Sequence, residues 1–257
     1  MPGKTHLFPC LEDNYGVLLH DPSSGATAAI DAPEAAAVEA ALTATGWKLT
    51  DILVTHHHND HTAGIPELKR RYGCRVVVPR REAARIADAD ATVAEGDSVS
   101  VGQLAGRVID TPGHTAGHIS YWFEPDKVAF VGDTLFSIGC GRLLEGTPEM
   151  MWQSLSKLRK LPDDTQVFCG HEYTAANVAF ARSVDPDNRT LIARAAEVAA
   201  LRAAGKPTIP ATIAAEKAAN PFLRADDPGL AAKLGLSGQP PASVFAKLRA
   251  GKDTFRG

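Results

Sequence analysis

The sequence has no long apolar run and no apolar leader segment. None of its apolar stretches approaches the roughly 20 residues that an α-helix needs to cross a bilayer. The opening residues, MPGKTHLFPCLEDNYG, contain neither an apolar core nor a small-residue cleavage site, so we expect no signal peptide. These absences predict a cytoplasmic protein without membrane association.

The chain also lacks an excess of either charge and a paired-cysteine motif. Its 27 Lys and Arg residues nearly balance 30 Asp and Glu residues, and the formal net charge is −3. Because there is no surplus of basic side chains to neutralise phosphates, the composition argues against a nucleic-acid partner. The four cysteines show no CxxC spacing, which predicts free, buried thiols in a reducing compartment. They are Cys10, Cys74, Cys140 and Cys169.

The first two-thirds of the chain alternate between strand-like and helix-like segments, whereas the last third is Ala-rich and helical. Helices are expected at 33–45, 66–72 and after Thr147, with Gly46 and Gly73 ending the first two. No strand signal follows residue 173. We therefore predict an α/β domain over residues 1–173 and an all-helical domain over 174–257. Apolar runs predict strands at 50–56, 74–79, 99–114, 118–124, 127–136 and 165–173.

One short stretch, LVTHHHNDHTAG at residues 53–64, concentrates metal-ligand side chains. In an extended segment alternate side chains share a face, so His56 and His58 project together while His57 points away. Asp60 and His61 follow in a tight turn and can aim at a neighbouring point. A single tetrahedral ion cannot use all these ligands, which favours two adjacent metal ions. Taken alone, the stretch could also be a surface loop that binds metal adventitiously.

Three later positions argue against that adventitious alternative. His114 follows a strand and a Pro-Gly turn, Asp133 follows a strand and Gly132, and His171 follows a strand and Gly170. A single strand-end Asp or His is most often a turn residue or a packed side chain. Three of them together with a complete HxHxDH segment indicate one assembled site, because loops at one edge of a sheet build such sites.

These motifs carry a resemblance to a known family. HxHxDH followed by TPGHTAG and GDTLF resembles the metallo-β-lactamase superfamily, which implies a four-layer αββα sandwich. The segments GCGR, GHEY and NPFLR, with the tail LRAGKDTF, are similar to those of glyoxalase II, the hydroxyacylglutathione hydrolase family. The resemblance extends over nearly the whole chain, including the C-terminal helical domain.

The resemblance implies a ligand set for two metal ions. One ion takes three histidines, the second takes Asp60 and two histidines, and the carboxylate of Asp133 bridges them. Nitrogen and carboxylate ligands suit zinc, iron or manganese, and we expect two divalent ions with zinc first. Thr55 and Thr111 are expected to support ligands through their hydroxyl groups. The first ion is assigned His56, His58 and His114, and the second Asp60, His61 and His171.

The implied reaction is the hydrolysis of S-D-lactoylglutathione to D-lactate and glutathione, in methylglyoxal detoxification. Two metals lower the pKa of a shared water towards neutrality, and the resulting hydroxide attacks the thioester carbonyl. Asp60 and Asp133 are the residues to which we assign the catalytic function, through the metals. A thiolate leaves readily because thiols have a pKa near 8.5, so no general acid is required. No GxSxG motif offers a competing nucleophile.

The substrate is expected to be a small glutathione thioester, bound by a monomer. Its carboxylates require cationic side chains. The resemblance implies contacts from Arg142, Tyr173, Arg249 and Lys252, and Asn177 lies four residues after Tyr173 on the same helical face. Family members can carry a tyrosine two positions after the basic residue, where this chain has Leu143 and Leu144. This departure affects glutathione affinity rather than the chemistry.

Two other functions compete with this prediction. Another superfamily hydrolase, or a persulfide dioxygenase-like enzyme with one iron, would share HxHxDH, but the complete second set of ligands favours a binuclear hydrolase. A non-catalytic metal-binding or glutathione-sensing protein would be favoured by the loss of a ligand, and none is lost.

Overall fold

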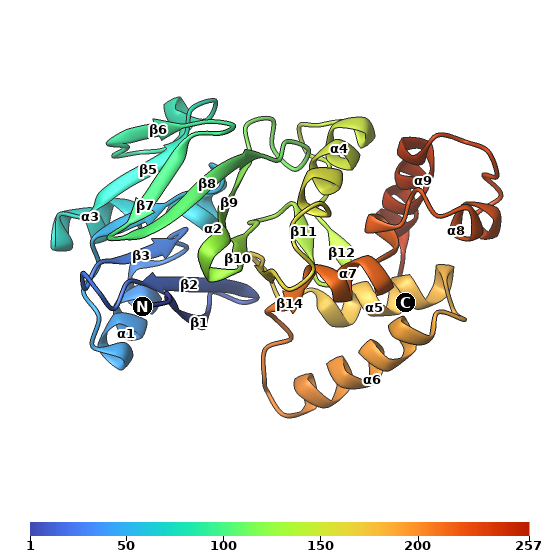
Figure 1. The fold of residues 1–257 in the computed structure, drawn as a ribbon, viewed down its shortest axis with the longest axis horizontal. Helices are drawn as coiled ribbons and strands as arrows, with labels where there is room; N and C mark the ends of the chain where they lie inside the picture. Colours follow the sequence, from blue (N-terminus) through green and yellow to red (C-terminus); the bar gives the residue numbers. More distant parts are fainter. Residues whose placement is uncertain (257) are drawn as a thin grey trace. The chain divides into compact units, whose positions relative to one another are not determined.

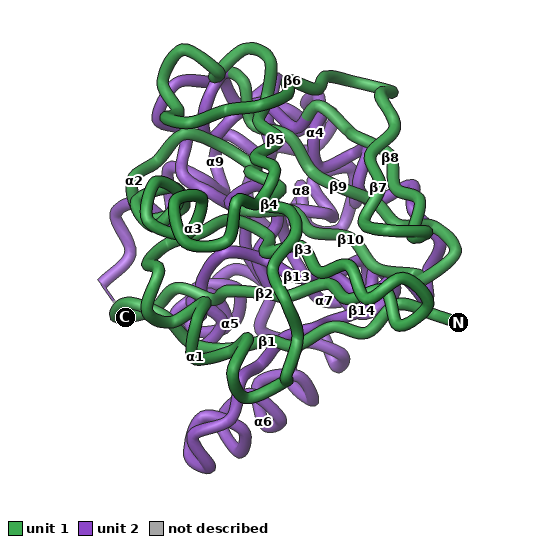
Figure 2. Tube along the Cα trace, turned by 90° about the vertical axis from the view of Figure 1, so that its left-hand side faces the viewer, with its two compact units in different colours: residues 1–110, 117–132 green, residues 111–116, 133–257 purple. Residues whose placement is uncertain are grey.

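The structure is a computed structural model that describes residues 1–256. It divides into two compact units, which Figure 2 shows in green and purple. Unit 1 comprises residues 1–110 and 117–132, and unit 2 comprises residues 111–116 and 133–257. The short segment 111–116, which carries His114, therefore belongs with the C-terminal half of the chain.

Unit 1 contains a mixed sheet of six strands that pair in sequence order (Figure 1). The first three strands are antiparallel, and the pairs from the third strand to the sixth are parallel. Several are almost continuously buried, as expected for strands covered on both faces. The strands are β1 (Lys4–Cys10), β2 (Asn14–His20), β3 (Thr27–Ile30), β4 (Asp51–Leu53), β5 (Arg75–Pro79) and β6 (Ala91–Val93).

Two helices pack against this sheet and close its core. Val38 and Leu68, one on each helix, are fully buried in one cluster with the strand residues. The helices end at Gly46 and Gly73, as predicted, and both glycines adopt the left-handed conformation that favours a residue without Cβ. The helical elements of this region are α1 (Ala35–Thr45), α2 (Asn59–Thr62), α3 (Ile65–Tyr72) and the 3₁₀ turn η1 (Ala83–Arg85).

The part of the second sheet that belongs to unit 1 contains four antiparallel strands, each paired with the next along the chain. Residues 99–114 were expected to form one strand and instead contribute to two. Gly102, with φ +57°, turns the chain between them. The elements are β7 (Ser98–Val101), β8 (Leu104–Asp110), β9 (Ile119–Phe123), the 3₁₀ turn η2 (Glu124–Asp126) and β10 (Val128–Phe130).

A buried tyrosine ties the second sheet to the segment that leads into the histidines. Tyr121 of β9 is fully buried, and its hydroxyl donates to the carbonyl oxygen of Val54 at 2.7 Å. The N–H of Ile119, on the same strand, donates to the carbonyl of Thr55 at 3.0 Å. Val54 and Thr55 follow β4 directly, so these two bonds fix the backbone from which the histidine segment starts.

Unit 2 combines two short strand pairs with α-helices. Thr147 caps the first helix as predicted, because its hydroxyl accepts from the N–H of Met150 at 3.3 Å. The elements are β11 (Leu135–Phe136), β12 (Gly139–Cys140), α4 (Pro148–Leu158), β13 (Gln166–Phe168), α5 (Thr174–Val184), α6 (Arg189–Ala203), β14 (Ala211–Thr212), α7 (Ile213–Ala219), the 3₁₀ turn η3 (Pro221–Leu223), α8 (Pro228–Lys233) and α9 (Pro241–Thr254).

The strand β14 corrects the expectation that residues 174–257 contain no strand. It pairs antiparallel with β13. Two residues are too short for a periodic pattern, so the sequence carried no signal for it. Elsewhere in this region the helices pack as expected, with Phe222 stacked on Phe180 and edge-on to Phe245, each at a ring separation of 5.9 Å. No helix within residues 1–256 is both long and apolar enough to span a membrane.

The bond from Tyr121 to Val54 gives a test of this architecture. We expect Tyr121→Phe to lower the free energy of unfolding by about 1–3 kcal/mol, because a buried carbonyl loses its partner while the ring still fills the core. Urea titration followed by circular dichroism measures the change. Tyr72→Phe, on the half-buried face of α3, is the control and should cost less. Equal stability of Tyr121→Phe and the wild type would contradict this role.

Candidate metal centre

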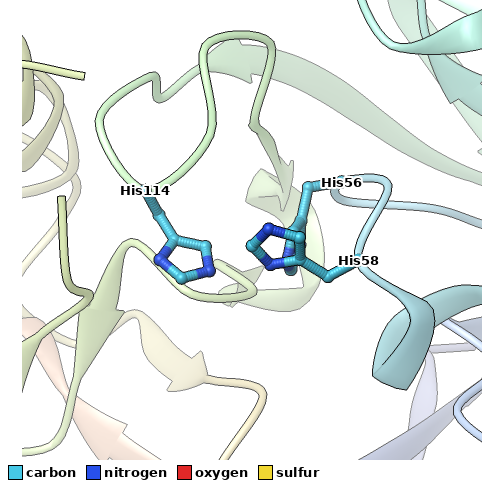
Figure 3. A group of neighbouring side chains, drawn as sticks. All are labelled: His56, His58 and His114. Carbon is cyan, nitrogen blue, oxygen red and sulfur yellow. The ribbon is translucent and has the colours of Figure 1, made fainter. Parts of the chain in front are cut away.

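His56 and His58 face one another just beyond the end of β4. The strand ends at Leu53, so the histidines lie in the loop after it rather than on the strand itself. Nε2 of His56 lies 3.0 Å from Nδ1 of His58. Figure 3 shows both side chains on this segment and places His114 on a separate loop. The two rings offer nitrogens to one point, as the alternation of side chains predicted.

A buried aspartate that the sequence analysis missed orients these histidines. Asp31 follows β3 and accepts from the N–H and the hydroxyl of Thr55, at 2.7 and 2.8 Å, and from Nδ1–H of His61 at 2.8 Å. The Thr55 oxygen in turn accepts from Nδ1–H of His56 at 3.0 Å, as expected of a supporting hydroxyl. Both histidines are thereby held in the tautomer whose Nε2 can bind a metal. The only signal was an Asp at the end of the apolar run ATAAI.

Asp60 and His61 form the second pair of predicted ligands in unit 1. They lie on the one-turn helix α2, where Oδ2 of Asp60 is 3.7 Å from Nε2 of His61. Asn14, at the start of β2, donates its side-chain amide to the carbonyl and the carboxylate of Asp60, at 3.1 and 3.2 Å. The sequence analysis assigned Asn14 no role, so its part in holding Asp60 was missed.

His57 points away from the other histidines, as predicted. Its N–H and Nδ1 both contact Oε2 of Glu82, at 2.6 and 2.8 Å. Glu82 also accepts from the N–H of Gly117 at 3.0 Å. His118, which belongs to neither predicted ligand set, is fully buried and stacks on His56 at 4.9 Å. The two residues therefore pack and brace the histidine segment.

The predicted ligands of unit 2 converge on one carboxylate. Nε2 of His114 and Nε2 of His171 each lie 3.3 Å from Oδ2 of Asp133. Nδ1–H of His114 donates to the carbonyl of Arg142 at 2.9 Å, which directs Nε2 towards the carboxylate. All three side chains are buried. Imidazole nitrogens and a carboxylate oxygen are donor types that divalent cations bind in proteins.

Two glycines lie where the backbone around Asp133 is closely packed. Gly132, directly before Asp133, has φ +45°, and a Cβ there would meet His118 and Thr55. A Cβ on Gly141 would overlap the carbonyl oxygen of Asp133. These contacts explain why glycine occupies both the GD and the GCGR motifs. Thr111, expected to support a ligand, offers its carbonyl to the hydroxyl of Thr134 at 3.1 Å.

A cavity of about 460 Å³ in unit 2 has two of these ligands in its wall. All five residues predicted to bind the substrate also line it. The remaining wall includes aromatic rings and the last turn of α9, so the cavity offers cationic and apolar surface to one ligand. Its lining is His114, Asp133, Phe136, Cys140, Arg142, Tyr173, Ala176, Asn177, Arg249, Lys252, Asp253, Phe255 and Arg256.

The substrate-side residues differ in how firmly they are held. Tyr173 stacks on His171 with ring centroids 4.7 Å apart and lies edge-on to Phe136 at 5.3 Å. Arg249 is buried, with its guanidinium donating to the carbonyl of Cys140 at 2.8 Å and to Asp253 at 2.8 Å. The protein thus occupies several of the Arg249 donors itself. Tyr173 and Arg249 define rigid parts of the cavity wall.

Burial changes the proton affinity of two groups in this wall. Desolvation, reinforced by the neighbouring Arg249, lowers the pKa of the Lys252 ammonium below its usual 10.5. Desolvation raises the pKa of the Cys140 thiol to about 11, despite the same guanidinium nearby. At neutral pH the Cys140 side chain in the cavity wall is therefore a protonated thiol. The four cysteines are all buried and free, as predicted.

Comparisons with known proteins match two consecutive segments of the chain. Family models described as "Metallo-beta-lactamase superfamily" and "Hydroxyacylglutathione hydrolase C-terminus" match residues 11–171 and 172–255. Hydroxyacylglutathione hydrolases from Rhodopseudomonas palustris (strain BisA53) and Bradyrhizobium sp. (strain ORS 278) are 60% and 58% identical over 253 residues, which is 98% of this chain and 99% of each relative. The crystal structure of ETHE1 from Myxococcus xanthus is 27% identical, covers 98% of both chains and has a TM-score of 0.66.

The fold and the donor set together define a class. The chain is an α/β protein with the metallo-β-lactamase fold and a helical C-terminal domain, as the motifs predicted. Within that class, the chain belongs to the hydroxyacylglutathione hydrolase family. Family membership and the His and Asp clusters imply divalent metal ions, and the buried group Asp31, His56 and His61 shows how closely such donors gather in unit 1.

Asp31 provides a test of how unit 1 prepares its ligands. We expect Asp31→Asn to weaken divalent-metal affinity by about 10- to 100-fold, because His61 and Thr55 lose the carboxylate that orients them. Competition with a chromophoric chelator measures the affinity. Asp51→Asn, at the start of β4, is the matched control and should leave it unchanged. Equal affinities for Asp31→Asn and the wild type would show that the ligands need no such support.

Proposed function

We propose that this chain is a binuclear thioester hydrolase that converts S-(2-hydroxyacyl)glutathione, S-D-lactoylglutathione in particular, to D-lactate and glutathione. One observation carries the proposal: a single cavity is lined both by two predicted metal ligands and by four cationic side chains. The names of the relatives, at about 60% identity over nearly the whole chain, support the same substrate. We place the reaction in the cytoplasm and expect the enzyme to act as a monomer.

The ligand assignment follows the two donor sets. We assign His56, His58 and His114 to one ion and Asp60, His61 and His171 to the other, with Asp133 shared. The 3.3 Å approach of two imidazole nitrogens to one Asp133 oxygen supports the shared role. Imidazole and carboxylate donors fit zinc first and iron or manganese next. When bound, two divalent ions acidify water and polarise a carbonyl group.

The protein's own residues hold the substrate and the ligands in place. Lys252 and Arg142 offer charge to the carboxylates of glutathione, and the amide of Asn177 lies in the same wall. Tyr173 presents a ring stacked on His171, so the thiol tripeptide and the ligands share one rigid support. The leaving thiolate needs no general acid because of its low pKa. Arg249 remains a predicted contact and also anchors the cavity wall.

The two leucines that follow Arg142 distinguish this chain from relatives with a tyrosine there. Leu144 is 54% exposed, and its N–H donates to the carbonyl of His114 at 3.3 Å. An exposed aliphatic side chain offers no hydroxyl to the tripeptide. Glutathione affinity in this chain therefore depends more strongly on its cationic side chains.

The activity has a direct test. Purified, zinc-loaded protein given S-D-lactoylglutathione should release free thiol and D-lactate in equal amounts. His58→Ala and Asp133→Ala should lower kcat by at least about 10³-fold, since each removes a metal ligand whose loss abolishes the binuclear site. Free thiol is measured with a chromogenic disulfide reagent, and D-lactate is measured with D-lactate dehydrogenase.

The matched control is His20→Ala, whose ring stacks on Trp47 at 4.4 Å and serves no predicted ligand role. It should retain wild-type activity. Metal-replete wild-type protein that releases no thiol would overturn the proposed function. Oxygen consumption with glutathione persulfide by a protein that binds one iron would favour the dioxygenase alternative instead.

The lowered pKa of Lys252 predicts how substrate affinity changes with pH. The ammonium form binds a carboxylate, so KM should rise as pH increases through the depressed pKa, which lies below the usual lysine value of 10.5. Lys252→Ala should have a KM raised about tenfold at neutral pH, because a charge-assisted hydrogen bond is lost.

Lys252→Arg is the control for this pH effect, because arginine stays charged over the whole range. Its KM should remain flat where that of the wild type rises. The measurement is KM for S-D-lactoylglutathione between neutral and alkaline pH, with spontaneous hydrolysis subtracted. A wild-type KM that does not change over this range would remove Lys252 from substrate binding.

A further inference from the structure

The hairpin formed by β11 and β12 connects the predicted metal ligand Asp133 to the substrate-side Arg142. Its strands contain only Leu135–Phe136 and Gly139–Cys140, paired antiparallel. Phe136 and Cys140, one from each strand, line the cavity. A two-by-two-residue hairpin has too few ladder bonds to be stable alone. Its position must come from the side chains around it.

Two cavity side chains are docked on the carbonyls of this hairpin. The amide of Asn177 donates to the carbonyl of Ser137 at 3.1 Å, and the guanidinium of Arg249 donates to that of Cys140 at 2.8 Å. Both side chains are almost fully buried and both line the cavity. Predicted substrate contacts therefore take their positions from the main chain of the hairpin.

The turn of the hairpin has a strained backbone, and a buried carboxylate binds its two residues. Ile138 has φ +56°, in the left-handed region that a β-branched residue rarely adopts. Its N–H donates to Oε2 of Glu216 at 2.8 Å, and the hydroxyl of Ser137 donates to Oε1 at 3.0 Å. The Ile138 side chain is buried in the helical core with Val178 of α5. One carboxylate thus binds both residues of the turn.

Asn220 also binds the hairpin and the carboxylate of Glu216. Its amide donates to the carbonyls of Gly139 and Phe136, at 2.9 and 3.3 Å, and to Oε2 of Glu216 at 2.9 Å. Asn220 is the first residue of the NPFLR motif, to which the proposed reaction assigns no role. Neither Asn220 nor Glu216 lines the cavity, and both are at most 1% exposed. They can affect the substrate only through the hairpin.

We propose that Glu216, together with Asn220, is a positioning residue for glutathione recognition: it fixes the β11–β12 turn on which Asn177 and Arg249 are seated. This inference rests on the proposed function for its choice of substrate. Burial raises the pKa of Glu216, and the donors of Ile138, Asn220 and Ser137 oppose that rise, so the contacts that hold the turn also stabilise the carboxylate.

The test compares Glu216→Met, which keeps the length of the side chain without an acceptor, with Glu216→Gln, which keeps one acceptor oxygen. For Glu216→Met we expect a KM for S-D-lactoylglutathione raised about tenfold, with kcat within about twofold of wild type. Its preference for this substrate over the lactoyl thioester of N-acetylcysteamine should fall by a similar factor. Glu216→Gln should restore part of the substrate affinity and part of the substrate preference, because its side chain can still accept from the N–H of Ile138.

Amide hydrogen exchange tests the same proposal without any substrate. Peptides that cover residues 135–142 should exchange faster in Glu216→Met than in the wild type, while those of α4 should not change. Asp185→Asn is the control, because Asp185 is also a carboxylate of low exposure but binds Arg224 and Lys233, at 2.6 Å each, rather than the hairpin. It should lower stability without changing the hairpin exchange or the substrate preference.

The outcomes separate this proposal from the proposed function. Loss of stability in Glu216→Met, with an unchanged hairpin exchange and substrate preference, would overturn the positioning role and leave Glu216 as a core residue. A wild type that does not hydrolyse the thioester would count against the proposed function, and the exchange measurement would still decide the role of Glu216. If Glu216→Met fails to fold, Ser137→Ala removes one of the same bonds and should show smaller changes in the same direction.

Discussion

A carboxylate that is taken out of water must be matched by donors or by cations, and this requirement organises both units of the protein. Asp31 is matched by Thr55 and His61, and this fixes the ring orientation of the histidine segment. Glu216 is matched by the turn of the hairpin, and this fixes one wall of the cavity. Each buried carboxylate requires hydrogen-bond donors, and it therefore fixes the positions of the groups that supply them.

Asp133 is the carboxylate whose surroundings differ from this pattern. The groups that approach its Oδ2 are imidazole nitrogens of His114 and His171, which can themselves act as ligands. Asp31 and Glu216 accept from N–H and O–H donors, whereas Oδ2 of Asp133 faces Nε2 of His114, whose Nδ1–H already donates to the carbonyl of Arg142. The contrast separates acids that shape the site from the acid that we assign to the metals.

The sequence was sufficient to predict the fold and the family, because several rare motifs occur in a fixed order. It also predicted that His57 is excluded from the ligands, since alternation of side chains decides which histidines share a face. The strand ends were predicted less well. The run at 99–114 contains a break at Gly102, and β14 has only two residues, so neither boundary leaves a periodic signal.

The residues that sequence reasoning missed act through tertiary contacts. Asp31 lies 24 positions before Thr55, Asn14 lies 46 positions before Asp60, and Glu82 lies 25 positions after His57. An aspartate at the end of a strand looks the same in sequence whether it caps a turn or orients a histidine. The types and spacing of residues in the sequence predict which groups coordinate a metal. The residues that orient those ligands can be identified only from the tertiary structure.

The burial of Cys140 has a consequence for the chemistry of a thioester cavity. A thiolate in this wall could accept the acyl group from the substrate and leave the protein itself acylated, because thiol–thioester exchange requires only a nucleophilic sulfur. With its pKa raised to about 11, the Cys140 side chain is almost entirely protonated at neutral pH. The desolvation that keeps this sulfur unreactive leaves water as the acceptor of the acyl group. Burial of Cys140 therefore prevents the substrate from acylating the enzyme.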